Sequence, residues 1–338
     1  QTTLAAQLAT SIQNVRSFEQ SRKQAEMESL VNTIGQKIQR TTSIEETLQT
    51  AIRELGTAIG ASRVFIGPRT LHELREGMAR ILEAFPVYRT YIRPDTGSVG
   101  ARDQAVVGEA LTAALHRQTD LGPDAWRLIE DALLLKPTGP AESEFVLRFQ
   151  QLTGPVMAKG VEDTSFYCFN RLVSLNEVGG NPGEFGTAPD AFHAFCLRIQ
   201  SDWPRTMLAS ATHDTKRGED TRLRIGLLSE VPQRWVAAVR RWSRMNARFR
   251  RDGFPDANTE YFFYQTLAGA WPIGCDRLGS AMLKAAKEAK VHTSWTDPDP
   301  AFEEALRVFV VEVLGHADFT TDLAAFLEPL AWPAVVAS

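Results

Sequence analysis

Cysteine is scarce in this sequence, and long hydrophobic runs are missing from it. The 338 residues contain three cysteines, Cys168, Cys196 and Cys275, and none belongs to a CxxC pair. An odd number of scattered cysteines does not make a disulfide framework, so we interpret all three as reduced thiols of a cytoplasmic protein. The first residues lack the basic and apolar regions of a signal peptide, and no stretch approaches the roughly 20 apolar residues of a membrane helix.

An excess of charge of one sign is also missing. The chain has 37 lysines and arginines against 41 aspartates and glutamates, which leaves a net charge of -4. A chain this close to neutral predicts neither a nucleic-acid partner nor a membrane partner. The six histidines form no HExxH motif and no paired metal-ligand spacing, so we predict neither a metal site nor a cofactor. The hydrophobic fraction of 43% is enough for a folded core.

Residues 1–67 contain no proline, tryptophan, tyrosine or aspartate, whereas all 17 prolines and all seven tryptophans follow them. Such a step in composition predicts two segments of different origin, at residues 1–66 and 69–338. In the first segment, apolar residues recur at three- and four-residue spacing from Leu4 to Ile38, which is typical of an amphipathic helix. Such a helix could form a coiled coil, and we expect a homodimer through residues 4–38 if it does.

A second apolar stripe follows Ser43, which is placed as a helix N-cap, and a short strand is predicted at residues 62–66. The stretch IEETLQTAIRELGTAIGASRVFIG resembles the opening helix and first strand of a GAF sensor domain behind a coiled-coil linker. The resemblance covers roughly residues 20–66. The alternative interpretation is an ordinary amphipathic helical leader.

The second segment alternates long helical patterns with short strand-like runs. Strands are predicted at residues 87–92 and 206–210. Helices are predicted at residues 71–85, 105–116, 126–135, 142–152, 233–251, 260–270, 278–289 and 301–314. Helix dominates, with a few strands at long intervals. We therefore predict an α/β fold that is mostly helical, namely a partial (β/α)8 barrel with large helical insertions and a helical subdomain, behind a coiled-coil-like leader.

The strongest local feature for chemistry is the predicted strand at 206–210 and the polar residues that follow it. Catalytic groups of barrel enzymes lie at the C-terminal ends of strands. His213 and Asp214, placed there, could hydrogen-bond vicinal hydroxyls of a sugar, and Lys216 and Arg217 would keep Asp214 ionised. Such bonds strengthen as a sugar ring flattens toward an oxocarbenium ion. A helix cap or a solvated turn is the alternative for a bare His-Asp pair.

A second polar stretch begins at Gly154-Pro155, which predict a turn-rich loop. Charged and aromatic side chains of this kind line sugar subsites, because planar apolar faces stack on sugar rings and charged groups bond to hydroxyls. The candidate substrate-binding residues of this stretch are Lys159, Glu162, Asp163, Tyr167, Asn170 and Arg171. A helix N-terminus with acidic first-turn residues is the alternative. The glycine-rich stretch at 176–186 lacks a phosphate-binding motif, and we interpret it as turn structure.

Taken together, the stretches at 85–92, 154–186, 203–224, 264–272 and 282–299 resemble the maltooligosyl trehalose synthase family, over about residues 71–333. The resemblance implies an isomerase of the alpha-amylase superfamily that acts on maltooligosaccharides. Such an enzyme converts the terminal alpha-1,4 linkage into an alpha,alpha-1,1 linkage by a retaining mechanism, in trehalose biosynthesis. It further implies that Asp214 is the carboxylate that stabilises the transition state, with His213 beside it.

The resemblance has gaps. The family places its nucleophile Asp in an Arg-x-Asp-His motif and its acid Glu on a following strand, and the 338 residues contain neither motif. We therefore expect an internal piece of such an enzyme, joined to a foreign leader, with impaired transglucosylation. The alternatives are a signalling or interaction module driven by the leader, and a carbohydrate-binding body without turnover.

Overall fold

A computed structural model describes residues 68–116, 121–136 and 139–337. The chain divides into two compact units, Gln1–Gly160 and Val161–Ser338. The predicted helical leader, its GAF-like helix and strand and the dimer segment at 4–38 all lie outside the described residues.

The described part of the first unit consists of helices. Their bounds are α3 Pro68–Glu83, α4 Ala101–Leu115, α5 Pro123–Leu133 and α6 Pro140–Met157. Each lies where the sequence predicts a helix. Gly122 and Gly139 precede helices that begin with proline, whose fixed φ suits the first helical turn. Apolar faces of the four helices share one core, in which Ile81, Ala110 and Phe149 are almost fully buried.

The strand predicted at 87–92 is wrong. Residues 87–92 are irregular, apart from an isolated bridge between Arg93 and Ser98 next to them. The reason is visible at Ile92, whose backbone N–H donates to Oε1 of Gln150 at 2.7 Å while its C=O accepts from Nε2 at 3.1 Å. A buried side-chain amide thus takes both bonds that a neighbouring strand would otherwise supply.

The loop predicted from Gly154 is also wrong, because helical backbone continues through it. Pro155 lies inside α6, and α6 is followed by a π-helix, η2, at Ala158–Ser165 and then by α7 at Phe166–Cys168. Proline has no N–H and crowds the preceding turn, which favours local rearrangement of the hydrogen-bond ladder. π-Helical turns are rare in proteins overall. Those that do occur are often found at functional sites.

The second unit is helical too. Its longer helices are α8 Pro189–Asp202, α9 Glu219–Gly226, α10 Pro232–Asn246, α11 Ala257–Ala270, α12 Cys275–Ala289, α13 Pro300–Gly315 and α14 Ala317–Ala337. Short 3-10 turns lie at η3 Val173–Leu175, η4 Leu227–Ser229 and η5 Ala247–Phe249. The predicted helices at 233–251, 260–270, 278–289 and 301–314 are confirmed by α10 to α13, whereas α8, α9 and α14 were not predicted.

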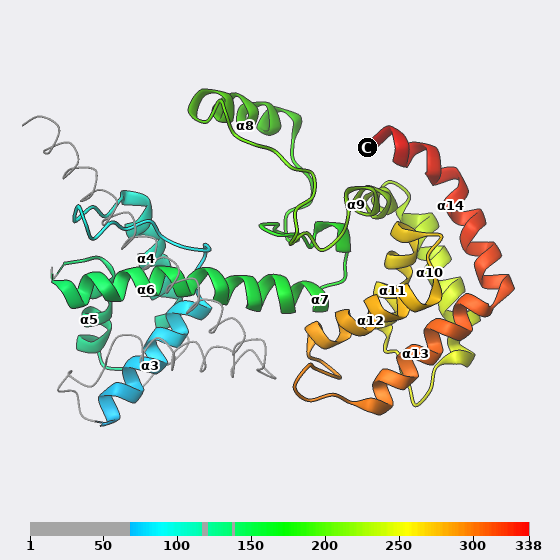
Figure 1. Ribbon diagram of the computed structural model, residues 1–338, viewed down its shortest axis with the longest axis horizontal. Coiled ribbons are helices and arrows are strands. Elements are labelled where there is room, and N and C mark those ends of the chain that lie inside the picture. Colours follow the sequence, from blue (N-terminus) through cyan, green and yellow to red (C-terminus); the bar gives the residue numbers. More distant parts are fainter. Residues whose placement is uncertain (1–67, 117–120, 137–138, 338) are drawn as a thin grey trace, which may run out of the picture. The chain divides into compact units, whose positions relative to one another are not determined.

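Aromatic side chains fill the core of the second unit. Trp242 of α10 is fully buried and contacts Trp235, Tyr264, Phe319 and Phe326 at centroid distances of 5.4 to 5.8 Å. These residues come from α10, α11 and α14, so one cluster ties three helices together. Figure 1 shows α11 among α9, α10 and α12.

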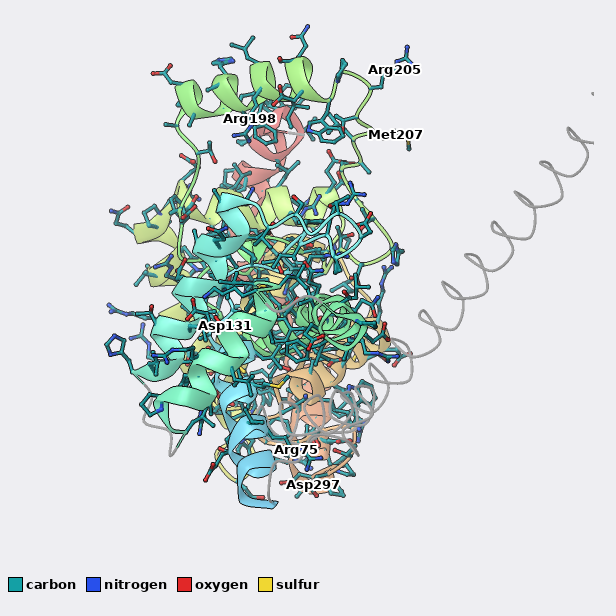
Figure 2. All side chains as sticks on the ribbon, turned by 90° about the vertical axis from the view of Figure 1, so that its left-hand side faces the viewer. Arg75, Asp131, Arg198, Arg205, Met207 and Asp297 are labelled. Atoms are coloured by element: carbon teal, nitrogen blue, oxygen red, sulfur yellow. The ribbon has the colours of Figure 1, made fainter. Side chains whose placement is uncertain are left out.

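The described residues contain no β-strand, so the partial barrel is not seen in this part of the chain. The strand predicted at 206–210 is an irregular segment in which Met207 and Leu208 are 95% and 88% exposed. Figure 2 shows Arg205 and Met207 projecting from this segment after α8. An apolar run forms a strand only when a partner strand supplies hydrogen bonds and cover. No described residue forms a strand beside 206–210, where the guanidinium of Arg222 donates to the backbone oxygen of Ser210.

The three cysteines are free of disulfides, as expected, and Cys196 is exposed on α8. The residues that the structure describes include no helix that is both long and apolar enough to cross a membrane.

Candidate functional site

Asp163 and Lys216 form the centre of the candidate site. Nζ of Lys216 lies 2.5 Å from Oδ1 of Asp163, although 53 residues separate them in the chain. The lysine side chain is only 9% exposed. Burial lowers the pKa of Lys216, but the hydrogen bond and the charge of Asp163 outweigh it, so that the pKa lies above its ordinary value. Two predicted substrate-binding residues are therefore in direct contact, and the lysine stays charged.

Glu177 holds the segment that carries Lys216. Its two carboxylate oxygens accept from the backbone N–H groups of Lys216 at 2.9 Å and Arg217 at 2.8 Å. Arg222 of α9 lies 3.8 Å from the same carboxylate. Sequence reasoning missed Glu177, since it interpreted 176–186 only as turn structure. The sequence shows only that Glu177 lies shortly before the Gly179-Gly180 pair. This is a weak indication of a functional role, because the residues that bond to Glu177 are distant in the chain.

Arg217 is buried against the helical core. Its guanidinium donates to the backbone oxygen of Val173 at 3.1 Å and lies over the ring of Phe262, 5.4 Å from the centroid. Burial lowers the pKa of Arg217, and the charges of Tyr167 and Glu177 only partly offset that effect. Among the described residues, no carboxylate bonds to this guanidinium, so the cation is held by a carbonyl dipole and an aromatic face.

Glu162 supports the turn that contains Glu177. It is 2% exposed in η2, and its Oε1 accepts from the N–H of Gly179 at 3.1 Å. Gly179 has a φ of +72°, which is costly for other residues. Nδ2 of Asn176 donates to the backbone oxygens of Phe166 and Phe169, both at 2.7 Å. The turn is thus tied to η2 and α7 at several points, and Glu162 has a structural role in this conformation.

His213 and Asp214 lie in an exposed turn. The N–H of Asp214 donates to Oγ1 of Thr212 at 3.3 Å, and Oγ1 of Thr215 donates to the backbone oxygen of Thr212 at 2.8 Å. The pair does not follow a strand, and it does not cap α9, which begins later behind Gly218. The solvated turn is the interpretation that this conformation matches. The charge of Asp214 acts on Lys216 and favours its protonated form.

Three predicted residues lie elsewhere or serve the fold. Asn170 is buried, and its backbone oxygen accepts from Nε2 of Gln265 at 2.7 Å. Arg171 donates to the backbone oxygen of Pro182 at 2.8 Å and stacks over Phe169. Lys159 belongs to the part of η2 that falls in the first unit, and it is half-buried there.

A cavity of about 500 Å3 opens beside Lys216 and Arg217. Tyr167 also lines it, and burial raises the pKa of this tyrosine. The remaining lining comes mainly from α9, α11 and α12. The structure thus brings Tyr167, Lys216 and Arg217 to one cavity and joins Asp163 to them through Lys216. A cavity of this size accommodates a small molecule.

Two curated proteins that resemble this chain are named maltooligosyl trehalose synthase. A maltooligosyl trehalose synthase assigned in Mycobacterium tuberculosis (strain H37Rv) is 44% identical over 168 residues, which cover 48% of this chain and 21% of that protein. The same match occurs in strain CDC 1551 / Oshkosh. No family model matches the sequence.

Solved structures agree with this result. The maltooligosyltrehalose synthase of Arthrobacter ramosus has a TM-score of 0.70 and 32% sequence identity, covering 90% of this chain and 38% of that one. A hypothetical maltooligosyl trehalose synthase from Sulfolobus tokodaii has a TM-score of 0.64 and 26% identity, with 90% and 37% covered. The chain therefore spans well under half the length of these proteins. Its homologues and structural neighbours are maltooligosyl trehalose synthases, enzymes of the alpha-amylase superfamily.

Proposed function

We propose that this chain supplies part of an active site for intramolecular transglucosylation of maltooligosaccharides, in trehalose biosynthesis. The observation that carries the proposal is the contact between Asp163 and Lys216. It ties the turn that contains His213 and Asp214 to η2, so that residues from two distant stretches meet at one cavity. Both stretches resemble the synthase family, and a similarity to a solved synthase over 90% of this chain supports the same assignment.

In this proposal, Asp214 stabilises the positive charge that develops on the sugar ring in the transition state, and His213 donates a hydrogen bond beside it. Lys216, kept charged by Asp163, donates to sugar hydroxyls, and Arg217 adds positive charge behind it. Tyr167 offers an aromatic face on which a glucose ring can stack. The partial barrel belongs to the proposal too, with its strands supplied by parts of the protein that the described residues do not include.

The retaining mechanism also needs a carboxylate nucleophile and a carboxylic acid. The motifs that carry these groups in the family do not occur among the 338 residues. We therefore propose that the chain by itself binds maltooligosaccharides and has little synthase activity.

Titration of the full chain with maltopentaose in a calorimeter tests the binding part. We expect measurable binding that weakens by about tenfold in Asp214→Asn, which corresponds to about 1.4 kcal/mol. Asp190→Asn is the matched control, because Asp190 is an exposed aspartate on α8 that lies outside the candidate site. Binding that is absent, or that is equally strong in both variants, would contradict the proposal.

An assay for loss of reducing ends from maltopentaose tests the activity part. We expect almost no loss with this chain alone, and turnover typical of an enzyme, at about 1 per second or faster, would show that the proposed impairment is wrong.

A further inference from the structure

The cavity beside Lys216 has a strong excess of positive charge. Five cationic side chains line it, Lys216, Arg217, Arg224, Arg277 and Lys284, and Asp220 is the single carboxylate among the lining residues. Asp163 offsets the charge of Lys216 from outside the lining. The proposed function uses Tyr167, Lys216 and Arg217 of this lining for a neutral oligosaccharide. The cavity thus holds three further cations that this function does not use. Its charge therefore favours an anionic ligand.

Two of these cations are available to a ligand. Arg277 and Lys284 are both exposed on α12 and lie seven residues apart, which places them on one face of the helix two turns from each other. Neither makes a hydrogen bond or an ion pair with a residue that the structure describes. Arg224 on α9, which also lines the cavity, donates to the backbone oxygen of Trp271 at 3.1 Å through Nη1 alone. Three side chains from two helices thus present unused donors to the same space.

The start of α12 adds to this positive potential. Gly274 is the N-cap residue and lines the cavity, and no side chain of a described residue accepts a hydrogen bond from the first-turn N–H groups. Free N–H groups at the start of a 15-residue helix attract anions, and phosphate groups bind at such positions in many proteins. The first-turn carboxylate, Asp276, is not among the residues that line the cavity.

We propose that this cavity binds a phosphorylated sugar, with the phosphate group between Arg224, Arg277 and Lys284 and the sugar ring toward Tyr167. Arginine and lysine side chains from two helices suit a phosphate group, which accepts several charge-assisted hydrogen bonds at once. The volume of about 500 Å3 exceeds what a bare phosphate needs, and the half-buried aromatic ring of Tyr167 gives a sugar a face to stack on. This site shares Tyr167 with the transglucosylation proposal but depends on Arg224, Arg277 and Lys284, which that proposal does not use.

Calorimetric titration of the full chain with glucose 6-phosphate, inorganic phosphate and glucose tests this proposal. Glucose 6-phosphate should bind most tightly, inorganic phosphate more weakly, and glucose without measurable heat. The double variant Arg277→Gln/Lys284→Gln should bind glucose 6-phosphate at least tenfold more weakly. The matched control is Arg205→Gln/Arg244→Gln, which removes the same charge from arginines that do not line the cavity and should bind like the unmodified chain.

The unmodified chain provides a second test that does not depend on how well a variant folds. Because charge-assisted bonds at an open site are screened by salt, the affinity for glucose 6-phosphate should fall several-fold between low and high sodium chloride concentration. Absence of binding, equal binding by glucose, or equal weakening by both double variants would overturn the proposal. Inorganic phosphate that binds as tightly as glucose 6-phosphate would overturn the role given to the sugar ring.

Discussion

Lys216 and Asp163 show, at the scale of single residues, how a charge is kept in a nearly buried position. Removing an ammonium group from water is costly unless an opposite charge and hydrogen bonds replace the lost hydration. Asp163 supplies both for Lys216, whose pKa is raised in spite of burial. The raised pKa contributes stability that is fully present below pH 10.5 and is lost as the pH rises through the folded-state pKa.

Glu177 gives the first prediction at this scale. Glu177→Ala removes the acceptor for two backbone N–H groups and should weaken maltopentaose binding by about tenfold, because the turn that carries Lys216 and Arg217 loses its support. Glu177→Gln retains one acceptor oxygen, so its affinity should fall between those of the unmodified chain and Glu177→Ala. Calorimetry on both variants checks this order. Equal affinity in all three proteins would mean that the turn does not depend on Glu177.

Asp322 gives a prediction about pH. Burial raises the pKa of Asp322, but hydrogen bonds from Arg241 at 2.7 Å and from Nε1 of Trp242 at 2.5 Å outweigh it, so that the pKa lies below 3.8. The stabilisation is therefore complete above about pH 4 and is lost as the pH falls through the folded-state pKa. Asp322→Asn should lower the free energy of unfolding at pH 7 by about 1–3 kcal/mol.

The same variant should also show a smaller loss of stability on acidification than the unmodified chain. Urea unfolding followed by tryptophan fluorescence, at neutral pH and at about pH 3, measures both effects. Glu312→Gln serves as the control, because Glu312 is exposed on α13 and has no bonded partner among the described residues. An unchanged acid dependence in Asp322→Asn would refute the role of the carboxylate.

At the scale of elements, the contact between α9 and α11 depends on a glycine. A Cβ atom at Gly269 would lie 2.7 Å from Cγ1 of Ile225 and 2.8 Å from Cγ2 of Thr221. These distances are too short for carbon atoms, so the two helices would have to move apart. Ile225 is fully buried in the core of the second unit, which leaves little room for that movement.

Gly269→Ala should therefore destabilise the second unit by about 1–3 kcal/mol, in spite of the better helix propensity of alanine. Gly279→Ala is the matched control, because Gly279 lies inside α12 and a Cβ atom there would meet no neighbouring atom within 4 Å. Alanine at this position should stabilise the chain by about 0.4–1 kcal/mol. Urea denaturation of both variants measures the two changes. Two shifts in the same direction would show that helix propensity, and not the close approach, decides the outcome.

At the scale of the whole molecule, the described residues form two large hydrophobic cores and a small third cluster of Ile92, Leu135 and Val146. Phe149 is buried in the core of the first unit and Trp242 in that of the second, and the two clusters share no residue. Truncating a large buried aromatic residue typically costs about 3–5 kcal/mol. Phe149→Ala and Trp242→Ala should therefore destabilise different parts of the chain.

Differential scanning calorimetry checks this expectation. Two transitions should appear, with Phe149→Ala lowering the temperature of one and Trp242→Ala that of the other. Fluorescence gives an independent assignment, because Trp126 is the sole tryptophan before Gly160. A single transition that both variants lower equally would show that the chain unfolds as one cooperative unit.

The sequence by itself determined most of the helices, the types of residue in the candidate site and the resemblance to maltooligosyl trehalose synthases. Helical periodicity is local, so α3 to α6 and α10 to α13 were predictable from spacing alone, whereas the two prolines inside α14 hide that helix. Residue types such as the aspartate and lysine at 163 and 216 indicated sugar chemistry before any contact was known.

Only the tertiary structure decided which of these residues meet. Asp163 bonds to Lys216 at a sequence separation of 53 residues, and Glu177 bonds to Lys216 at a separation of 39. No local sequence pattern specifies such pairs. The two strand predictions were wrong for the same reason. A strand forms only when it pairs with another strand, and the spacing of residues within one segment does not show whether such a partner exists. At Ile92 the amide of Gln150 takes that partner's place, and beside 206–210 no described residue forms a strand.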